Sequence, residues 1–392
     1  PEQIVLVYSE EMLVKKALVE KALCSIEGYH PKVVIESIIL KNDEVYLFDK
    51  MYEVMGQIIE KYSGTDHQSI LNLSSGTPQI ISALFALNRI NDYNTQAIQV
   101  ATPNKSANRK YVPLSSEDEQ KLFDENEDNQ KNYEDRTIKD EAEKFNQSLI
   151  KRHLRNLISS YDYLAAEELV TRKEYNKLLS KKKLARLRDI LNDFVKVFKT
   201  QAILKDIQGY SLTEVEKKAL NYFLMIEVLK ERGQVADVLI KSKSYVEFII
   251  EEKIKKDYPE LIKYDGTFPK LNEEYKDFEA ILDFIDLEFK KAKGIKDEKE
   301  RIYSPQSTLN LLSYENILSY YQVSPELLKS IKLINSLNGE RNKVAHGLSE
   351  IDSKLVNSRK LQQTIDTLRF ILQDTFEIDD SYFSCYQTLN NE

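Results

Sequence analysis

The six residues from Arg341 to His346, Arg-Asn-Lys-Val-Ala-His, are those whose types and spacing best fit a chemical reaction. A histidine ordinarily titrates near neutrality, so His346 suits acid–base work on the 2′-hydroxyl of RNA. Arg341 can stabilise the charge that develops on the phosphate, and Asn342 can orient the histidine or the phosphate. The chain holds only 4 His. The motif therefore predicts a site for RNA cleavage.

The Arg-x4-His spacing is common by chance, so its setting decides its meaning. The alternative is a solvated arginine followed by a histidine that ends a helix before Gly347. We predict one amphipathic helix from Ser324 to Val344, because Ser324 suits the N-cap and Pro325 the first turn. Arg341 falls in its apolar stripe, where an unpaired charge is costly. It therefore needs a partner, a subunit interface or a ligand.

The geometry of a helix constrains how this motif can act. Five residues turn the side chain by roughly 140° beyond a full turn, so Arg341 and His346 diverge if the helix is regular. They converge if the helix loosens near Gly347, or if a second copy of the chain supplies the other half. The spacing thus favours a composite site in a two-fold homodimer.

Composition excludes several classes of function. The 392 residues are 42% hydrophobic and 31% charged, with a net charge of −8 and a pI near 5.4. No apolar run approaches a membrane span, no signal peptide is visible, and the two cysteines, Cys24 and Cys385, lie far apart. We therefore expect a cytoplasmic protein with no disulfide framework and no zinc cluster.

An acidic chain that acts on RNA needs a local basic surface. Two basic runs are present, and we interpret both as solvated helix faces. The first comprises Lys181, Lys182, Lys183, Arg186 and Arg188, and the second comprises Lys290, Lys291, Lys293 and Lys296.

The first 103 residues alternate short β-branched runs with helical patterns. The predicted strands are Ile4–Tyr8, Val33–Leu40, Ile70–Leu73 and Ala97–Ala101. The predicted helices lie near 11–24, 45–62 and 78–90. This order predicts an α/β, Rossmann-like domain with a mostly parallel sheet that is covered on both faces.

The rest of the chain divides into two parts. Residues 104–140 include an acidic stretch with few apolar residues and are predicted to be an acidic linker or an exposed excursion. Residues 141–392 show apolar side chains every three or four positions and few β-rich runs, which predicts an all-α region. Thr213 and Glu216 have the spacing of a capping box within it.

A second informative stretch lies between a predicted strand and a predicted helix, at residues 72–79. It places the N-terminus of the predicted helix, which is the positive end of the helix dipole, beyond the carboxyl end of a parallel strand. Open sheets bind ligands at this position. The candidate ligand-binding residues are Asn72, Ser74, Ser75, Gly76, Thr77 and Gln79. The alternative is a well-capped strand–helix turn with no ligand, in which Thr77 only caps the helix.

The two stretches together resemble one family, the CARF–HEPN ribonucleases that accompany type III-A CRISPR systems. Asn-Leu-Ser-Ser-Gly-Thr-Pro-Gln at 72–79 is similar to the ligand loop of the CARF domain, and Arg341–His346 to the HEPN active-site motif. Ile-Gln-Val-Ala-Thr-Pro at 98–103 and Tyr-Asp-Tyr-Leu-Ala-Ala at 161–166 also resemble family segments.

The resemblance implies a CARF domain that senses a cyclic oligoadenylate from the effector complex, with cyclic hexa-adenylate favoured. It also implies a HEPN domain that cuts single-stranded RNA without metal, in a homodimer whose sites straddle the two-fold axis. The family normally begins with a strand and a phosphate-contacting loop that have no counterpart before Pro1. Two alternatives stay open: a non-enzymatic nucleotide-sensing interaction module, and an ungated HEPN toxin ribonuclease.

Overall fold

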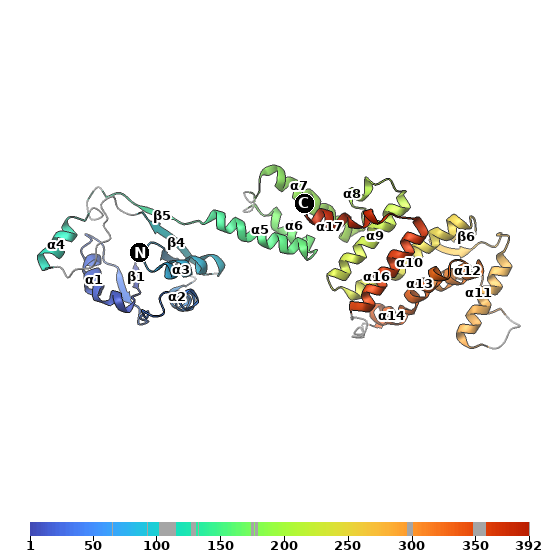
Figure 1. The fold of residues 1–392 in the computed structure, drawn as a ribbon, viewed down its shortest axis with the longest axis horizontal. Helices are drawn as coiled ribbons and strands as arrows, with labels where there is room; N and C mark the ends of the chain where they lie inside the picture. Colours follow the sequence, from blue (N-terminus) through green and yellow to red (C-terminus); the bar gives the residue numbers. More distant parts are fainter. Residues whose placement is uncertain are drawn as a thin grey trace. The chain divides into compact units, whose positions relative to one another are not determined.

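The computed structural model describes residues 1–64, 66–91, 93–101, 115–126, 131, 133–173, 176, 179–295, 301–347 and 358–391 (Figure 1). The chain forms two compact units, Pro1–Ser148 and Leu149–Glu392. Each has its own hydrophobic cluster.

The N-terminal unit is built from short, mainly parallel strands. Its strands are β1 (Gln3–Leu6), β2 (Lys32–Ile35), β3 (Ser69–Asn72), β4 (Thr95–Val100) and β5 (Thr137–Lys139). β1 pairs in parallel with β2, with Ile4 opposite Val33. β3 pairs in parallel with β4, and β5 adds to β4 in the antiparallel direction. The four predicted strands are thus present, each shifted by one or more residues at its ends, and the α/β class is confirmed.

Helices follow the strands as the pattern predicted. They are η1 (Glu10–Lys15), α1 (Lys16–Cys24), α2 (Phe48–Tyr62) and α3 (Pro78–Ile90). α2 and α3 pack against each other around a small cluster that contains Met51, Met55 and Leu87. Gly56 lies in this contact, because a Cβ there would sit 3.5 Å from the Leu87 side chain.

The prediction of a sheet covered on both faces is wrong for this single chain. Ile70 of β3 is 53% exposed and Ile138 of β5 is 57% exposed. Their partners in β4, Gln96 and Gln99, point to opposite faces because side chains alternate along a strand. Each face of the β3–β4–β5 sheet therefore carries an exposed isoleucine. The described helices pack on one another more than on this sheet.

The acidic segment contributes structure to the N-terminal unit. Residues 116–124 form α4 (Ser116–Asp124), whose N-cap is Ser115, and residues 137–139 form β5. The acidic pair Glu127 and Asp128 and the loop-like residues 104–108 lie outside the described residues. Because β5 completes a sheet, this segment fits an excursion of the unit better than a linker, and the exact domain boundaries stay a prediction.

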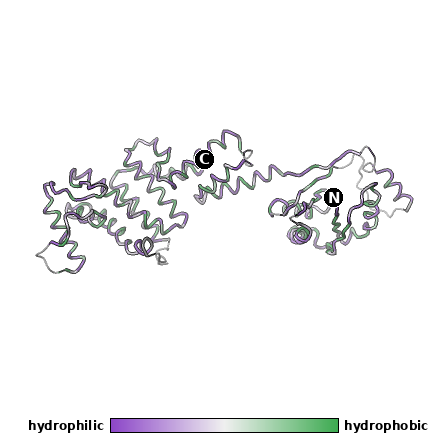
Figure 2. The backbone as a smooth tube through the Cα atoms, turned by 180° about the vertical axis from the view of Figure 1, so that it is seen from behind, coloured by the Kyte–Doolittle hydropathy of each residue, from purple (hydrophilic) through white to green (hydrophobic). Residues whose placement is uncertain are grey.

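The C-terminal unit is mainly helical, as predicted. Its helices are α5 (Glu143–Ser159), α6 (Tyr163–Thr171), α7 (Lys181–Thr200), α8 (Lys205–Gln208), α9 (Glu214–Glu231), α10 (Val235–Asp257), α11 (Phe278–Lys293), α12 (Leu311–Tyr320), α13 (Pro325–Ser336), α14 (Asn338–Gly347), α16 (Ser358–Phe376), η4 (Asp380–Ser384) and α17 (Cys385–Asn391). Apolar and polar stretches alternate along many of them (Figure 2). The capping box at Thr213 and Glu216 opens α9 as predicted.

The core of this unit lies around α9, α10 and α16. α9 and α10 pack against each other, and α16 contacts both. Aromatic side chains join the N-terminal helices of the unit to its C-terminus: Tyr163 stacks on Phe194 at 4.0 Å, and Phe194 meets Tyr386 edge-on. Hence α6, α7 and α17 form one packed body. No helix in the described parts of the chain is long and apolar enough to cross a bilayer.

One element of this unit was not predicted from the sequence. β6 (Ile262–Asp265) and β7 (Phe268–Leu271) form an antiparallel hairpin between α10 and α11. Its turn includes Gly266, whose φ of 62° is readily adopted only without a Cβ. Asp265 pairs with Phe268, so the two-residue turn is Gly266-Thr267, and a glycine at the first central position is a known hairpin signal that the sequence did carry.

The single helix predicted from Ser324 to Val344 is divided in the structure. α13 ends at Ser336 with Leu337 as its C-cap, and α14 begins at Asn338. The dipeptide Asn338-Gly339 has low helix propensity, which accounts for an interruption at this point. The prediction of one continuous helix is therefore wrong. The N-cap is correct, because the Ser324 hydroxyl accepts from the Leu327 amide.

Candidate active site and ligand loop

The 72–79 loop is a strand–helix turn in which several polar side chains have structural roles. The Asn72 side chain accepts a hydrogen bond from the Ser74 amide at 2.9 Å. The Ser74 hydroxyl accepts from the amide of Val100 in the neighbouring strand at 2.5 Å. Thr77 caps α3 by accepting from the Ile80 amide, and its hydroxyl donates to the Val45 carbonyl at 3.0 Å. These bonds hold the loop in shape.

The other candidates in this loop lie free at its surface. Ser75 and Gly76 are exposed and Gln79 is half-buried, and neither Ser75 nor Gln79 makes a side-chain hydrogen bond among the described residues. Gly76 has a φ of 119°, and a Cβ there would come within 3.1 Å of Ile80. A glycine is therefore required for the turn. In the first turn of α3, Pro78 has no N–H and the Ile80 amide donates to Thr77, so the Gln79 amide is the backbone donor that this turn offers to an anionic ligand among the described residues.

The Arg-x4-His motif lies on α14, a ten-residue helix that packs against α10 and α13. Arg341 is half-buried, in agreement with its predicted place on the apolar side. Its Nη1 donates to the Asn342 side-chain oxygen at 3.0 Å, while its Nε is buried and has no hydrogen-bond partner among the described residues. Lys343 is exposed and pairs with Glu340 at 2.7 Å.

The side chain of His346 lies outside what the structure describes. For residues 344–347 only the backbone is described, and it continues α14 to Gly347. A regular helix separates positions 341 and 346 around its axis. The divergence expected from the spacing therefore applies to the backbone, and Leu348 lies outside the described residues.

A partly buried polar chain leads from the core to the start of α14. Glu315 of α12 is 8% exposed, and its carboxylate accepts from the Asn335 amide at 3.2 Å. Burial raises the pKa of Glu315, and the Asn335 hydrogen bond offsets part of that effect. The Asn338 amide in turn donates to Asn335. The Asn338 side-chain oxygen is buried and unpartnered, one helical turn before Arg341. Sequence reasoning missed this chain because its members come from three helices.

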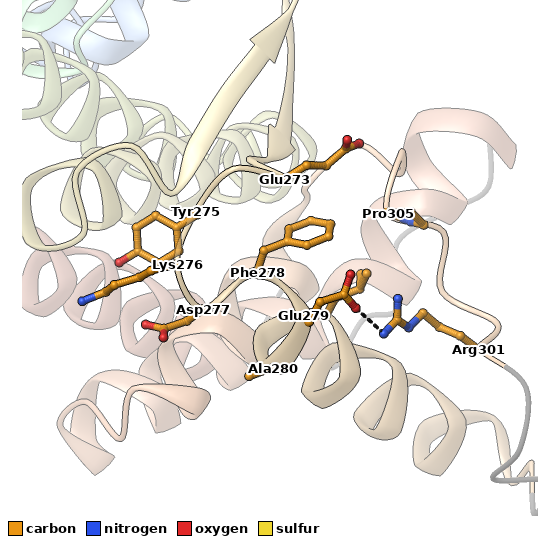
Figure 3. Close-up of a pocket in the computed structure, with 10 residues that line it drawn as sticks. Glu273, Tyr275, Lys276, Asp277, Phe278, Glu279, Ala280, Arg301 and Pro305 are labelled. Carbon is orange, nitrogen blue, oxygen red and sulfur yellow. Dashed lines mark hydrogen bonds and ion pairs between the residues drawn. The ribbon is translucent and has the colours of Figure 1, made fainter.

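An open depression elsewhere in the unit does not include the motif. It is lined by residues around the start of α11 and the segment after the hairpin, among them Tyr275, Phe278 and Arg301 (Figure 3). Arg301 is bound there by Glu279 and Asp283. Its positive charge is thus already neutralised, and further carboxylates line the walls, so the depression does not suit an RNA phosphate. Among the described residues, no group of three His, Cys, Asp or Glu is placed to hold a metal ion.

Family models match both units. Residues 34–137 match the Cas_Csm6 CARF domain, and residues 207–392 match the Cas_Csm6 HEPN domain. A ligand-sensing α/β unit followed by a helical nuclease unit defines the class of CARF–HEPN ribonucleases. The resemblance predicted from the two motifs is confirmed.

Individual relatives show the same family. The chain is 62% identical to the CRISPR system endoribonuclease Csm6 of Streptococcus thermophilus, over 100% of this chain and 92% of the relative. It is 34% identical to Csm6′ of the same species, over 100% and 90%. A solved structure of Enterococcus italicus Csm6 bound to cyclic hexa-2′-fluoro-hexa-dAMP matches with a TM-score of 0.66 at 25% identity, over 100% of this chain and 91% of that one. The chain belongs to the Csm6 family of CRISPR-system endoribonucleases.

Proposed function

We propose that the chain is a metal-independent endoribonuclease that cuts single-stranded RNA in antiviral defence when a cyclic oligoadenylate binds its N-terminal unit. The observation that carries the proposal is the position of Arg341: an arginine on the packed side of α14, with a buried Nε that has no partner. Its family context and its neighbour Asn342 fit a phosphate-binding role. Cleavage takes place in the cytoplasm, where the RNA and the activator are made.

The chemistry requires one proton acceptor, one proton donor and a charge stabiliser. The 2′-hydroxyl attacks the adjacent phosphorus, and its proton passes to a His346 imidazole. The bond to the 5′-oxygen breaks, and that oxygen takes a proton from an imidazolium. Arg341 stabilises the added negative charge of the pentavalent phosphate. The products are a 2′,3′-cyclic phosphate and a 5′-hydroxyl, so atoms and protons balance without a metal.

A homodimer completes this site. The backbone of α14 separates positions 341 and 346, so a second chain supplies the missing half of the arrangement. One histidine can then act as the base and its partner's copy as the acid. The same two-fold axis would place two 72–79 loops around one activator, for which a ring with an even number of nucleotides is suited. The relative from Enterococcus italicus was solved with a ring of six nucleotides, which supports cyclic hexa-adenylate as the activator of this chain.

Two measurements on the purified protein test the proposal. RNA cleavage is measured with and without cyclic hexa-adenylate, in EDTA and in Mg²⁺. We expect strong stimulation by the ring, no loss in EDTA, and 2′,3′-cyclic phosphate ends. Cleavage that is equally fast without the ring would indicate an ungated enzyme. Loss in EDTA that Mg²⁺ restores would indicate a metal-dependent nuclease.

A further inference from the structure

The first basic run gathers at one end of a helical hairpin. α6 and α7 pack side by side, and the Arg188 guanidinium of α7 donates to the Val170 carbonyl of α6 at 2.9 Å. This bond places the end of α6 beside the first half of α7. Exposed cations from both helix ends therefore share one region, here called the hairpin end: Arg172, Lys173, Lys181, Lys182 and Lys183.

The charge of this region opposes that of the chain. Residues 172–188 contain eight Lys or Arg and one Glu, which gives a net charge of +7. The chain as a whole carries −8, so the remainder carries −15. The hairpin end also lies outside both segments matched by the family models, 34–137 and 207–392. It is a strong local positive field on an acidic protein.

The second basic run provides the contrast. Its described members lie at the C-terminal end of α11, where the helix dipole favours cations. Lys290 pairs with Asp286 at 2.8 Å and Lys291 with Glu288 at 2.7 Å, while Lys293 lies over the Phe289 ring. Lys296 lies outside the described residues. These lysines stabilise their own helix.

The lysines of the hairpin end do not stabilise theirs. Lys181, Lys182 and Lys183 occupy the first turn of α7, which contains no acidic residue, and the dipole opposes cations there by roughly 0.3–1 kcal/mol each. Within the described parts of the chain none of the three makes an ion pair. Among the described residues, neither an ion pair nor the helix dipole accounts for three charges in this place, which leaves them available to an external anion.

We propose that the hairpin end binds the sugar-phosphate backbone of the RNA substrate, away from the scissile phosphate. This rests on the proposed function, which supplies a polyanion long enough to reach beyond the active site. Exposed lysines in a helical turn that carries no acidic side chain suit phosphate contacts that do not depend on base sequence. Such contacts would supply the electrostatic part of the affinity of this acidic enzyme for RNA.

The test measures binding of an RNA that the enzyme cannot cut. The probe is a fluorescent single-stranded oligonucleotide of uniformly 2′-O-methylated RNA, which lacks the 2′-hydroxyl nucleophile. Its affinity for the full chain is measured by anisotropy over a range of KCl concentrations. For Lys182→Gln/Lys183→Gln we expect the salt slope to fall by about 0.7 per lost phosphate contact. At about 0.1 M salt this corresponds to roughly 5-fold weaker binding per contact.

The matched control is Lys291→Gln/Lys293→Gln, which removes the same charge from the other basic run. We expect its affinity and salt slope to equal those of the unaltered chain. Thermal unfolding checks the fold: Lys182→Gln/Lys183→Gln should be at least as stable as the unaltered chain, because it removes unfavourable dipole interactions. An unchanged slope in that variant, an equal loss in the control, or no binding by the unaltered chain overturns the proposal. Because the probe needs neither cleavage nor activator, the result does not depend on whether gating is confirmed.

Discussion

The two units differ in how firmly they hold their candidate sites. Among the described residues, the N-terminal cluster contains seven buried side chains, while the C-terminal cluster contains 49. The 72–79 loop lies at the surface of the smaller core, and α14 packs against α10 of the larger one. Regions with few buried contacts open and reshape at low cost, whereas a large core fixes geometry. Under the proposed function, sensing would lie in the more adaptable unit and the chemistry beside the larger, more rigid core.

The largest expected effect concerns the rigid side of this comparison. Arg341→Ala and His346→Ala should each lower activator-stimulated cleavage by roughly 1,000-fold, because each removes charge stabilisation or proton transfer from the transition state. Cleavage of a labelled RNA is measured alongside binding of cyclic hexa-adenylate, which both variants should retain.

The matched control for these variants is Lys343→Ala, on the same helix. Lys343 is exposed and points its charge to Glu340 rather than to the core. It should cut RNA within about 3-fold of the unaltered rate, as expected for a surface substitution. Near-normal cleavage by Arg341→Ala or His346→Ala would remove the motif from the mechanism.

The second effect concerns Glu227, a carboxyl group in the larger core whose ionised form is disfavoured by burial. Burial raises the pKa of Glu227 to about 7 from 4.5, partly offset by Arg369. The folded state therefore holds this proton more tightly, and stability falls as pH rises from about 4.5 to about 7. Above that range Glu227→Gln should be more stable than the unaltered chain by up to about 3 kcal/mol, with the difference absent at pH 4.5. Denaturant unfolding at several pH values measures this.

The exposed Glu231, one turn further along α9, provides the control for that experiment. Glu231→Gln removes the same charge at an exposed position of the same helix, so above pH 7 its effect on the free energy of unfolding should be smaller than that of Glu227→Gln. A pH-independent difference for Glu227→Gln as well would show that its carboxylate is solvated in the folded protein. Water would then reach this part of the larger core more readily than its packing indicates.

The third effect concerns the adaptable loop. Ser75→Ala with Gln79→Ala should raise the activator concentration needed for half-maximal cleavage by roughly 10-fold, because two uncommitted polar side chains are lost from the ligand surface. Thr77→Ala should instead destabilise the N-terminal unit by about 1 kcal/mol, because Thr77 caps α3. Thermal unfolding and activation curves distinguish the two. If both variants change stability and neither changes the activation midpoint, the loop is only structural.

The smallest effect tests the partly buried polar chain that leads from Glu315 to Asn338 at the start of α14. Asn338→Ala should lower cleavage by about 10-fold, because the start of α14 loses its hydrogen bond to Asn335 and Arg341 is less well fixed. Asn338→Asp should recover little, since a second carboxylate would lie near the buried Glu315. A fall in kcat with an unchanged KM is expected of a positioning residue. If the loss of cleavage is fully explained by a larger unfolded fraction, as measured from the unfolding midpoint, Asn338 contributes to stability alone.

Local signals in the sequence predicted well where one residue dictates one backbone conformation. α3 was placed near 78–90 and occupies Pro78–Ile90, because Thr77 caps it and Pro78 suits its first turn. The capping box at Thr213 and Glu216 is similarly local and is present. The hairpin at 262–271 was missed, although Gly266 marked its turn, because its strands are short within a long helical pattern.

Features that depend on several distant segments could not be predicted. The hydrophobic period continued past Leu337, so the break before Asn338 was hidden. The buried link from Glu315 to Asn335 joins two helices, and no spacing announces it. The two basic runs looked equivalent in the sequence. The structure distinguishes the two runs by the helix ends that they occupy. It also shows that Lys290 and Lys291 of the second run have acidic partners.

The unpartnered Nε of Arg341 has a consequence for how the site meets a partner. A buried donor without an acceptor costs roughly 1–3 kcal/mol, which a lone chain bears continuously. Any encounter that brings an acceptor, whether a second chain or a substrate phosphate, relieves that cost. An acceptor that pairs with this Nε is therefore bound about 5- to 150-fold more tightly than it would be without that relief. A lone chain thus holds its arginine poised for association, with a second chain or with a phosphate, before any signal has been received.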